Sequence, residues 1–249
     1  MFKESNKQTT TSIVSEGENK KKSFIDADPE AKNGENRIVA KNKFSLEYCR
    51  LNPFRNCYFI FGASGAGKSY VCKDIIKSYV KLNKDHKDKI YLISQKKEDE
   101  TLDSLKYIKR INLNKIVGQK FEINKDLENS FFIFDDCESV DDPTIKEHIY
   151  FNWIKQILEL GRSYKINCIV TSHLPHGKFN KLAIFESHYV ISYLNSGAFR
   201  QTSYMLENYA GIDPKLIKKL KAKDSRWTMF HKNYPNFYVQ EKELAKITE

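Results

Sequence analysis

The eight residues Gly62-Ala63-Ser64-Gly65-Ala66-Gly67-Lys68-Ser69 decide the fold of this chain of 249 residues. They match the Walker A pattern GxxxxGK[ST], in which glycines let successive backbone N–H groups surround the phosphates of a nucleotide. The context agrees, because an apolar run at 57–61 predicts a strand before the loop and helical spacing predicts a helix over 69–81. We therefore expect all eight residues to bind ATP, with Lys68 on the β- and γ-phosphates and Ser69 on Mg²⁺.

Two carboxylates, Asp135 and Asp136, follow an apolar run at 131–134 that predicts another strand. The carboxyl ends of parallel strands meet at the ligand crevice, so both side chains should face the phosphates. We expect Asp135 to reach Mg²⁺ through water and Asp136 to orient or deprotonate the attacking water. Glu138, two residues further on, is the alternative general base.

Polar residues also end the strand predicted over 166–170. If this strand lies beside the strand of the phosphate loop, Thr171, Ser172 or His173 can contact the γ-phosphate or its water. The alternative is an ordinary turn before Pro175.

Arg162 precedes the same strand, directly after Gly161, where a helix that begins at Asp142-Pro143 is expected to stop. That end of the strand is opposite the nucleotide crevice, so Arg162 is poorly placed for its own ATP. It is either a surface residue or an arginine finger for the nucleotide of a neighbouring subunit.

The order of elements predicts an α/β protein of the P-loop NTPase class, with a mostly parallel central sheet and helices on both faces. Further strands are expected at 90–93 and 189–193, a further helix after Asp213-Pro214, and a C-terminal β-hairpin from 227–230 and 237–239. Residues 1–43 are rich in polar residues and are expected to form a disordered tail, so that the ATPase domain spans 44–249.

The charge of the chain and its composition indicate which classes of partner it can bind. The chain has 42 basic and 32 acidic residues, and the segments 73–97 and 211–232 each carry an excess of five positive charges. Such clusters favour nucleic acid as a partner; the alternative is a lysine-rich solvated surface.

No apolar run approaches the roughly 20 residues of a membrane span, and no signal peptide is evident, so membrane insertion and secretion are not expected. Five cysteines without a CxxC pair favour a reducing compartment over structural zinc or disulfides.

Taken in order, four motifs resemble the genome-packaging ATPases of poxviruses, giant DNA viruses and virophages, in the FtsK–HerA branch of P-loop motors. They are GASGAGKS, FFIFDD, GRSYKINCIVTSH and SRWTMFHKNYPNFYV, which begin at residues 62, 131, 161 and 225. The resemblance covers about residues 50–245. A polar residue at the position of His173 would sense whether the γ-phosphate is present. The family usually has Gln at this position, and often His at the position of Ser163, so this sequence departs from the family pattern at both.

The resemblance implies a homo-oligomeric ring that hydrolyses ATP with Mg²⁺ and pumps double-stranded DNA into a preformed viral capsid. It implies a capsid or portal-like vertex as partner, a location in a cytoplasmic virus factory or the virion, and Arg162 as a trans-acting residue. Two alternatives stay open. One is an ATP-binding assembly scaffold with weak hydrolysis, and the other is a small-molecule P-loop kinase, which is disfavoured because the sequence has no arginine-rich lid segment.

Overall fold

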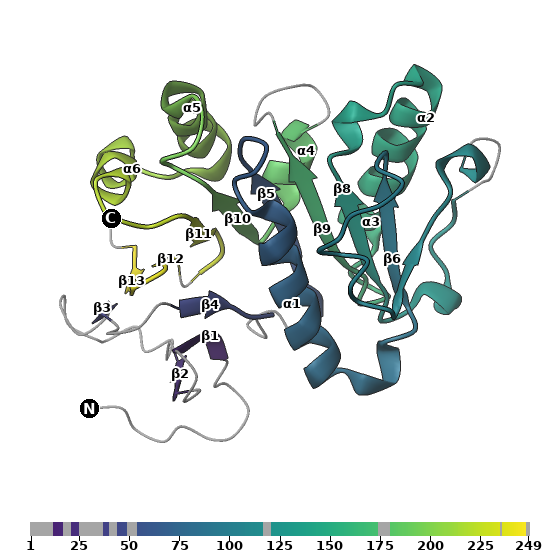
Figure 1. Ribbon diagram of the computed structural model, residues 1–249, viewed down its shortest axis with the longest axis horizontal. Helices are drawn as coiled ribbons and strands as arrows, with labels where there is room; N and C mark the ends of the chain where they lie inside the picture. Colours follow the sequence, from purple (N-terminus) through teal and green to yellow (C-terminus); the bar gives the residue numbers. More distant parts are fainter. Residues whose placement is uncertain are drawn as a thin grey trace.

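The computed structural model describes residues 12–16, 21–24, 37–39, 44–48, 54–116, 121–173, 180–234 and 236–247 (Figure 1). Its main element is a sheet of ten strands. Their order across the sheet is β3 (Arg37–Val39), β13 (Glu243–Lys246), β12 (Phe237–Gln240), β11 (Thr228–His231), β10 (Tyr189–Ser192), β5 (Cys57–Phe61), β9 (Asn167–Ser172), β8 (Phe131–Asp135), β6 (Ile90–Ser94) and β7 (Ile108–Arg110).

The six strands from β10 to β7 pair in parallel, and the four strands from β11 to β3 extend the sheet in antiparallel pairing. This confirms the α/β class and the C-terminal hairpin of β11 and β12. The expectation that the strand of the phosphate loop, β5, lies beside β9 is also confirmed, with Phe59 opposite Val170. Strand β13 was not predicted, because its sequence Glu-Leu-Ala-Lys places two apolar residues next to each other and shows no alternation.

Helices cover both faces of the sheet, as expected. Helix α1 (Lys68–Leu82) lies on one face, where Ile75, Ile76 and Tyr79 pack with Tyr58 and Ile60 of β5. Phe59 and Phe61 point to the opposite face, because side chains alternate along a strand. That second face carries α2 (Pro143–His148), α3 (Lys155–Leu160), α4 (Asn180–Glu186), α5 (Phe199–Ala210) and α6 (Pro214–Lys221).

The helix expected from Asp142 to Gly161 contains a π-helical segment, Ile149–Ile154, between α2 and α3. The wider turn adds a residue and rotates the last turn relative to regular α-helical spacing. Leu160, which the sequence places on the apolar face, is therefore 58% exposed, whereas Leu158 is buried.

Gly161 ends this helix by a different route from the one expected. Its φ of −64° is right-handed, not the left-handed conformation typical of a terminal glycine. A Cβ atom at Gly161 would lie 2.5 Å from the carbonyl oxygen of Ile157. The buried guanidinium of Arg55 donates to the carbonyls of Ile157 and Leu158, so a cation satisfies this helix end.

Part of the predicted tail carries strands. Within the tail, β1 (Ser12–Glu16) pairs with β2 (Lys21–Phe24), and β3 adds to the edge of the main sheet. Strand β1 also pairs with β4 (Phe44–Leu46), which follows the tail. Strand pairing uses backbone hydrogen bonds, which polar sequences also supply. The boundary between a tail at 1–43 and a domain at 44–249 stays a prediction.

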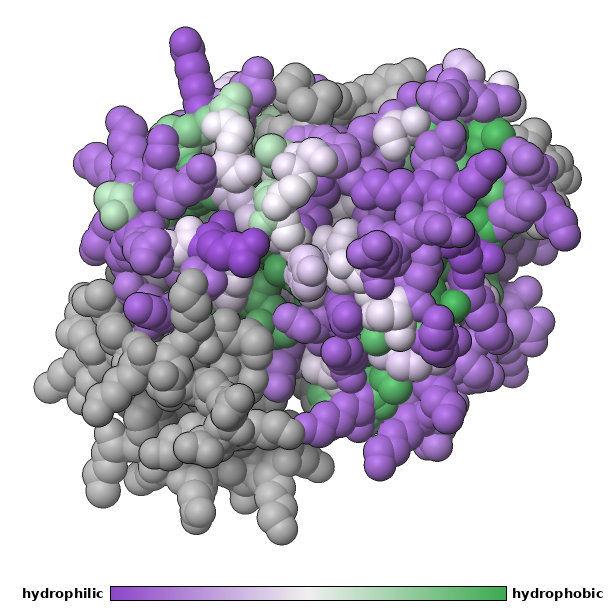
Figure 2. Space-filling view, viewed as in Figure 1, coloured by the Kyte–Doolittle hydropathy of each residue, from purple (hydrophilic) through white to green (hydrophobic). Residues whose placement is uncertain are grey.

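Short 3₁₀ helices occupy several connections: Lys84–His86, Leu113–Lys115, Lys125–Leu127 and Cys137–Ser139. Within the ranges given above, no helix combines the length and apolar character needed to cross a membrane. Figure 2 shows that the described surface in this view is mainly hydrophilic, with small separate apolar areas.

Candidate active site

The phosphate loop connects β5 to α1 at the carboxyl edge of the parallel strands, as its motif predicts (Figure 1). Gly65 and Gly67 have φ values of +75° and +109°, which residues with a Cβ rarely adopt. Position 62 has no room for a side chain, because a Cβ atom on Gly62 would lie 2.6 Å from the ring of Tyr193. The Gly62 N–H donates to Ser172 O at 3.1 Å, so the loop is tied to the end of β9.

Lys68 brings three of the predicted residues together. Its ammonium group is buried, with Nζ 2.9 Å from His173 Nδ1 and 3.6 Å from Asp136 Oδ1. His173 Nε2 lies 2.8 Å from Asp136 Oδ2. Because an ammonium group only donates, His173 Nδ1 must accept, and Nε2 then carries the proton that is donated to Asp136. The three side chains form a closed triangle, here named the Lys68–Asp136–His173 cluster.

Thr171 links the two carboxylates. Its hydroxyl lies 3.0 Å from Asp135 Oδ1 and 3.1 Å from Asp136 Oδ1, and it accepts the Asp136 N–H at 2.9 Å. Ser94, at the end of β6, donates to Asp135 Oδ2 at 3.2 Å. Burial and the neighbouring Asp136 raise the pKa of Asp135. The charged form of Asp135 is therefore disfavoured in the folded protein unless a cation compensates it.

The oxygen atoms near Ser69 suit Mg²⁺, which prefers carboxylates, hydroxyls and water. Ser69 Oγ donates to Asp99 Oδ2 at 3.2 Å. Ser69 and Asp135 would hold Mg²⁺, and Asp99 is an additional carboxylate beside it. Sequence reasoning missed Asp99, because it lies in a polar connection after β6 with no periodicity or motif to mark it. Lys96 was missed for the same reason; its Nζ is 3.9 Å from Asp136 Oδ2.

Glu138, the alternative base, contacts the end of β9. Its Oε1 accepts the Ser172 hydroxyl at 2.9 Å and the His173 N–H at 2.5 Å. Asp136 instead turns back toward Lys68 through a left-handed backbone with φ of 47°. The geometry thus places Asp136 at the phosphate loop and makes Glu138 a support for the end of β9.

Arg162 is not brought to this site. It lies in the exposed turn between α3 and β9, at the opposite end of β9 from the phosphate loop. Its guanidinium carbon lies 4.7 Å from the ring centre of Phe54. This position agrees with the expectation that Arg162 is poorly placed to reach the nucleotide of its own subunit.

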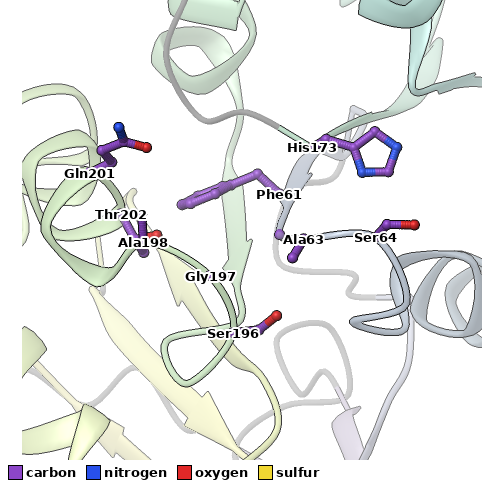
Figure 3. A pocket seen from close by; sticks show the side chains of 10 residues that line it. Phe61, Ala63, Ser64, His173, Ser196, Gly197, Ala198, Gln201 and Thr202 are labelled. Carbon is purple, nitrogen blue, oxygen red and sulfur yellow. The ribbon is translucent and has the colours of Figure 1, made fainter.

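A pocket of about 390 Å³ opens beside the phosphate loop. Figure 3 shows Ala63, Ser64 and His173 on one side of it and Gln201 and Thr202 of α5 on the other. Phe61 lies between the two sides.

Comparisons with known proteins find a relative that matches most of the chain. Protein V3 of Sputnik virophage, described as uncharacterized, is 32% identical over 225 residues, which cover 89% of this chain and 88% of that protein. The sequence matches no established family profile.

Two solved structures are more distant. The cytoplasmic domain of the type VII secretion ATPase EccC from Thermomonospora curvata aligns with 96% of this chain and 29% of its own length, at 14% identity and a TM-score of 0.50. This likeness concerns the fold alone. The genome packaging NTPase B204 from Sulfolobus turreted icosahedral virus 2, in complex with AMPPCP, aligns with 77% of this chain and 98% of its own length, at 14% identity and a TM-score of 0.49. A score at this level does not by itself establish a common fold.

Proposed function

The chain belongs to the family of protein V3 of Sputnik virophage, and from this membership and the geometry of the phosphate loop we propose that it is an ATP-driven motor. The motor translocates double-stranded DNA into a preformed viral capsid. The observation that carries the proposal is the Lys68–Asp136–His173 cluster, which assembles three groups from three separate segments at the phosphate loop.

Each residue of the site has a distinct task in hydrolysis. The backbone N–H groups of the loop and the N-terminus of α1 bind the phosphates, and Lys68 neutralises charge on the β- and γ-phosphates. Asp136 accepts the proton of the attacking water, which its place beside Lys68 supports. His173 holds the Asp136 carboxylate through Nε2 and can exchange this contact for the γ-phosphate.

Bound Mg²⁺ supplies positive charge to the phosphate oxygens during transfer. Ser69 and Asp135 would hold it, and Thr171 and Ser94 orient the Asp135 carboxylate. Asp99 accepts a hydrogen bond from the Ser69 hydroxyl and would add negative charge near the ion.

Support for DNA as the partner comes from charge. Helix α6 buries Ile217 and Leu220 and leaves Lys215, Lys218 and Lys219 exposed on its other side. An exposed row of ammonium groups contacts phosphates and does not distinguish bases. Such contacts suit a motor that must move along any sequence.

Support for a ring comes from Arg162. In a head-to-tail ring, a heterologous contact can carry a residue at the far edge of one sheet to the nucleotide of the next subunit. We place the assembled ring at a capsid or portal-like vertex, in the virus factory or the virion.

Turnover of ATP by the full chain, with and without long duplex DNA, tests the proposal. The motor predicts hydrolysis that duplex DNA stimulates and that Lys68→Ala abolishes. Negligible turnover under both conditions would select the scaffold, and turnover that depends on a small phosphate acceptor would select the kinase.

A further inference from the structure

The last glycine of the phosphate loop lies against a second cation, Arg226. A Cβ atom built on Gly67 would lie 3.4 Å from Arg226 Nη2 and 3.8 Å from the Tyr193 hydroxyl. Gly67 has a φ of +109° and is the N-cap of α1, so only a glycine suits this conformation. The guanidinium therefore approaches the part of the loop from which α1 begins.

The position of Arg226 is fixed by the C-terminal extension of the sheet. Its backbone N–H donates to Glu241 Oε2 at 2.9 Å. The buried Ser225 before it donates to Trp227 O at 2.7 Å and accepts the Glu241 N–H at 3.1 Å. Strands β11 and β12 thus hold the backbone of Arg226 beside the loop, while its side chain stays exposed at the loop surface.

The chemistry of this position is that of a phosphate contact. The loop N–H groups near Gly67 cradle the α- and β-phosphates, whereas Lys68 reaches the β- and γ-phosphates. A guanidinium matches phosphate oxygens with two parallel N–H donors. The Tyr193 hydroxyl, which also lies near Gly67, is buried and has no hydrogen-bond partner among the residues that the structure describes. The ring of Tyr193 packs against Gly62.

We propose that Arg226 is a second cationic group of the nucleotide site, which binds the α- and β-phosphates in the same subunit. This inference rests on the proposed ATPase function, and it gives the antiparallel extension a direct part in nucleotide binding. It also separates two roles. Arg226 recognises phosphates that ATP and ADP share, whereas His173 and Asp136 face the γ-phosphate that distinguishes them.

Calorimetric titration of the full chain with ADP and with AMPPCP, both with Mg²⁺, tests the assignment. Arg226→Ala should weaken both ligands by the same factor, roughly 10- to 100-fold, since one charge-assisted contact is lost. Arg226→Lys should recover part of the affinity. The melting temperature of the nucleotide-free protein should not change, because the side chain is exposed. Lys242→Ala removes an exposed charge from the same extension and serves as the matched control.

Three results would overturn the assignment. Arg226→Ala could bind both ligands as the wild type does while Lys68→Ala binds weakly, in which case the ATPase proposal stands and the role of Arg226 falls. A loss confined to AMPPCP would move Arg226 to the γ-phosphate. Failure of the wild type to bind either nucleotide would overturn the ATPase proposal and the role of Arg226 together.

Discussion

Lys68 Nζ lies 3.6 Å from Asp136 Oδ1, and both groups are almost completely buried. A buried ion pair of this kind is costly to separate unless another charge takes the place of one partner. A γ-phosphate can take that place, because it offers Lys68 new acceptors and frees the Asp136 carboxylate for a water molecule. In the proposed mechanism, the contact between Lys68 and Asp136 would couple the binding of ATP to the release of Asp136 as the general base.

Replacement of Lys68 by Ala should abolish hydrolysis and leave the fold intact. Loss of a charge-assisted contact to the transferred phosphate costs several kcal/mol of transition-state stabilisation, which corresponds to a fall of about 100-fold or more in turnover. Steady-state phosphate release and a melting curve measure the two effects. Lys77→Ala, an exposed lysine of the same helix, is the control. Turnover at the wild-type level would remove Lys68 from the site.

Asp136→Asn should bind ATP but lose turnover by about 100-fold, because an amide cannot accept the proton of the attacking water. Glu138→Gln should retain more activity, since Glu138 faces Ser172 and the His173 backbone. Nucleotide binding and single-turnover hydrolysis separate these effects. Normal hydrolysis by Asp136→Asn together with an inactive Glu138→Gln would assign the base to Glu138 instead.

Asp135→Asn should weaken Mg²⁺ dependence and raise the melting temperature of the nucleotide-free protein at neutral pH. Burial and Asp136 raise the pKa of Asp135, so the folded state binds this proton more tightly than the unfolded state and loses stability as the pH rises. The advantage of the variant should be present above the raised pKa. It should vanish below the ordinary pKa of an aspartate, where both proteins are neutral at this position.

Melting curves over a pH series measure this effect. Asp224→Asn, which changes an exposed carboxylate, is the control. A lower melting temperature for Asp135→Asn at neutral pH would show that the carboxylate stabilises the fold and would contradict the argument.

Reversal of charge at Lys218 and Lys219 should weaken DNA binding without regard to sequence. Both side chains are exposed on α6, so the helix should fold as before. Each lost phosphate contact should reduce the log–log dependence of affinity on salt by about 0.9. Titrations with duplexes of two unrelated sequences at several salt concentrations provide the measurement. Unchanged affinity and an unchanged salt slope would exclude α6 from the DNA interface.

Arg162→Ala and Lys68→Ala should each be inactive alone, while a mixture of the two should recover some turnover. Recovery requires an intact Lys68 site that faces an intact Arg162 from the next subunit. A fully active Arg162→Ala, or mixtures that never recover activity, would leave Arg162 as a surface residue stacked on Phe54.

Local sequence predicted the parts of the site whose signals lie within one segment. The phosphate loop and the Asp135-Asp136 pair stand next to apolar runs, so both the element and its end could be located. Asp99 and Lys96 could not be found, because their place at the site depends on β6 lying next to β8. The order of strands is a tertiary property that no local pattern contains.

The same limit applies to the helices. Helix α5 was not predicted; only Thr202, Met205 and Leu206 of its twelve residues are buried. The π-helical segment at Ile149–Ile154 left the predicted spacing plausible while it moved Leu160 to the surface. Arg226 lies in one of the four motifs on which the family resemblance rests, but only the fold brings its side chain close to Gly67.

The most direct test of the central claim is displacement of a third strand from a long DNA duplex. A motor that moves along duplex DNA should remove the third strand when ATP and Mg²⁺ are present, and should fail with AMPPCP or when Lys68 is replaced by Ala. We predict displacement whose rate follows ATP turnover. DNA-stimulated ATP hydrolysis without any displacement of the third strand would contradict translocation.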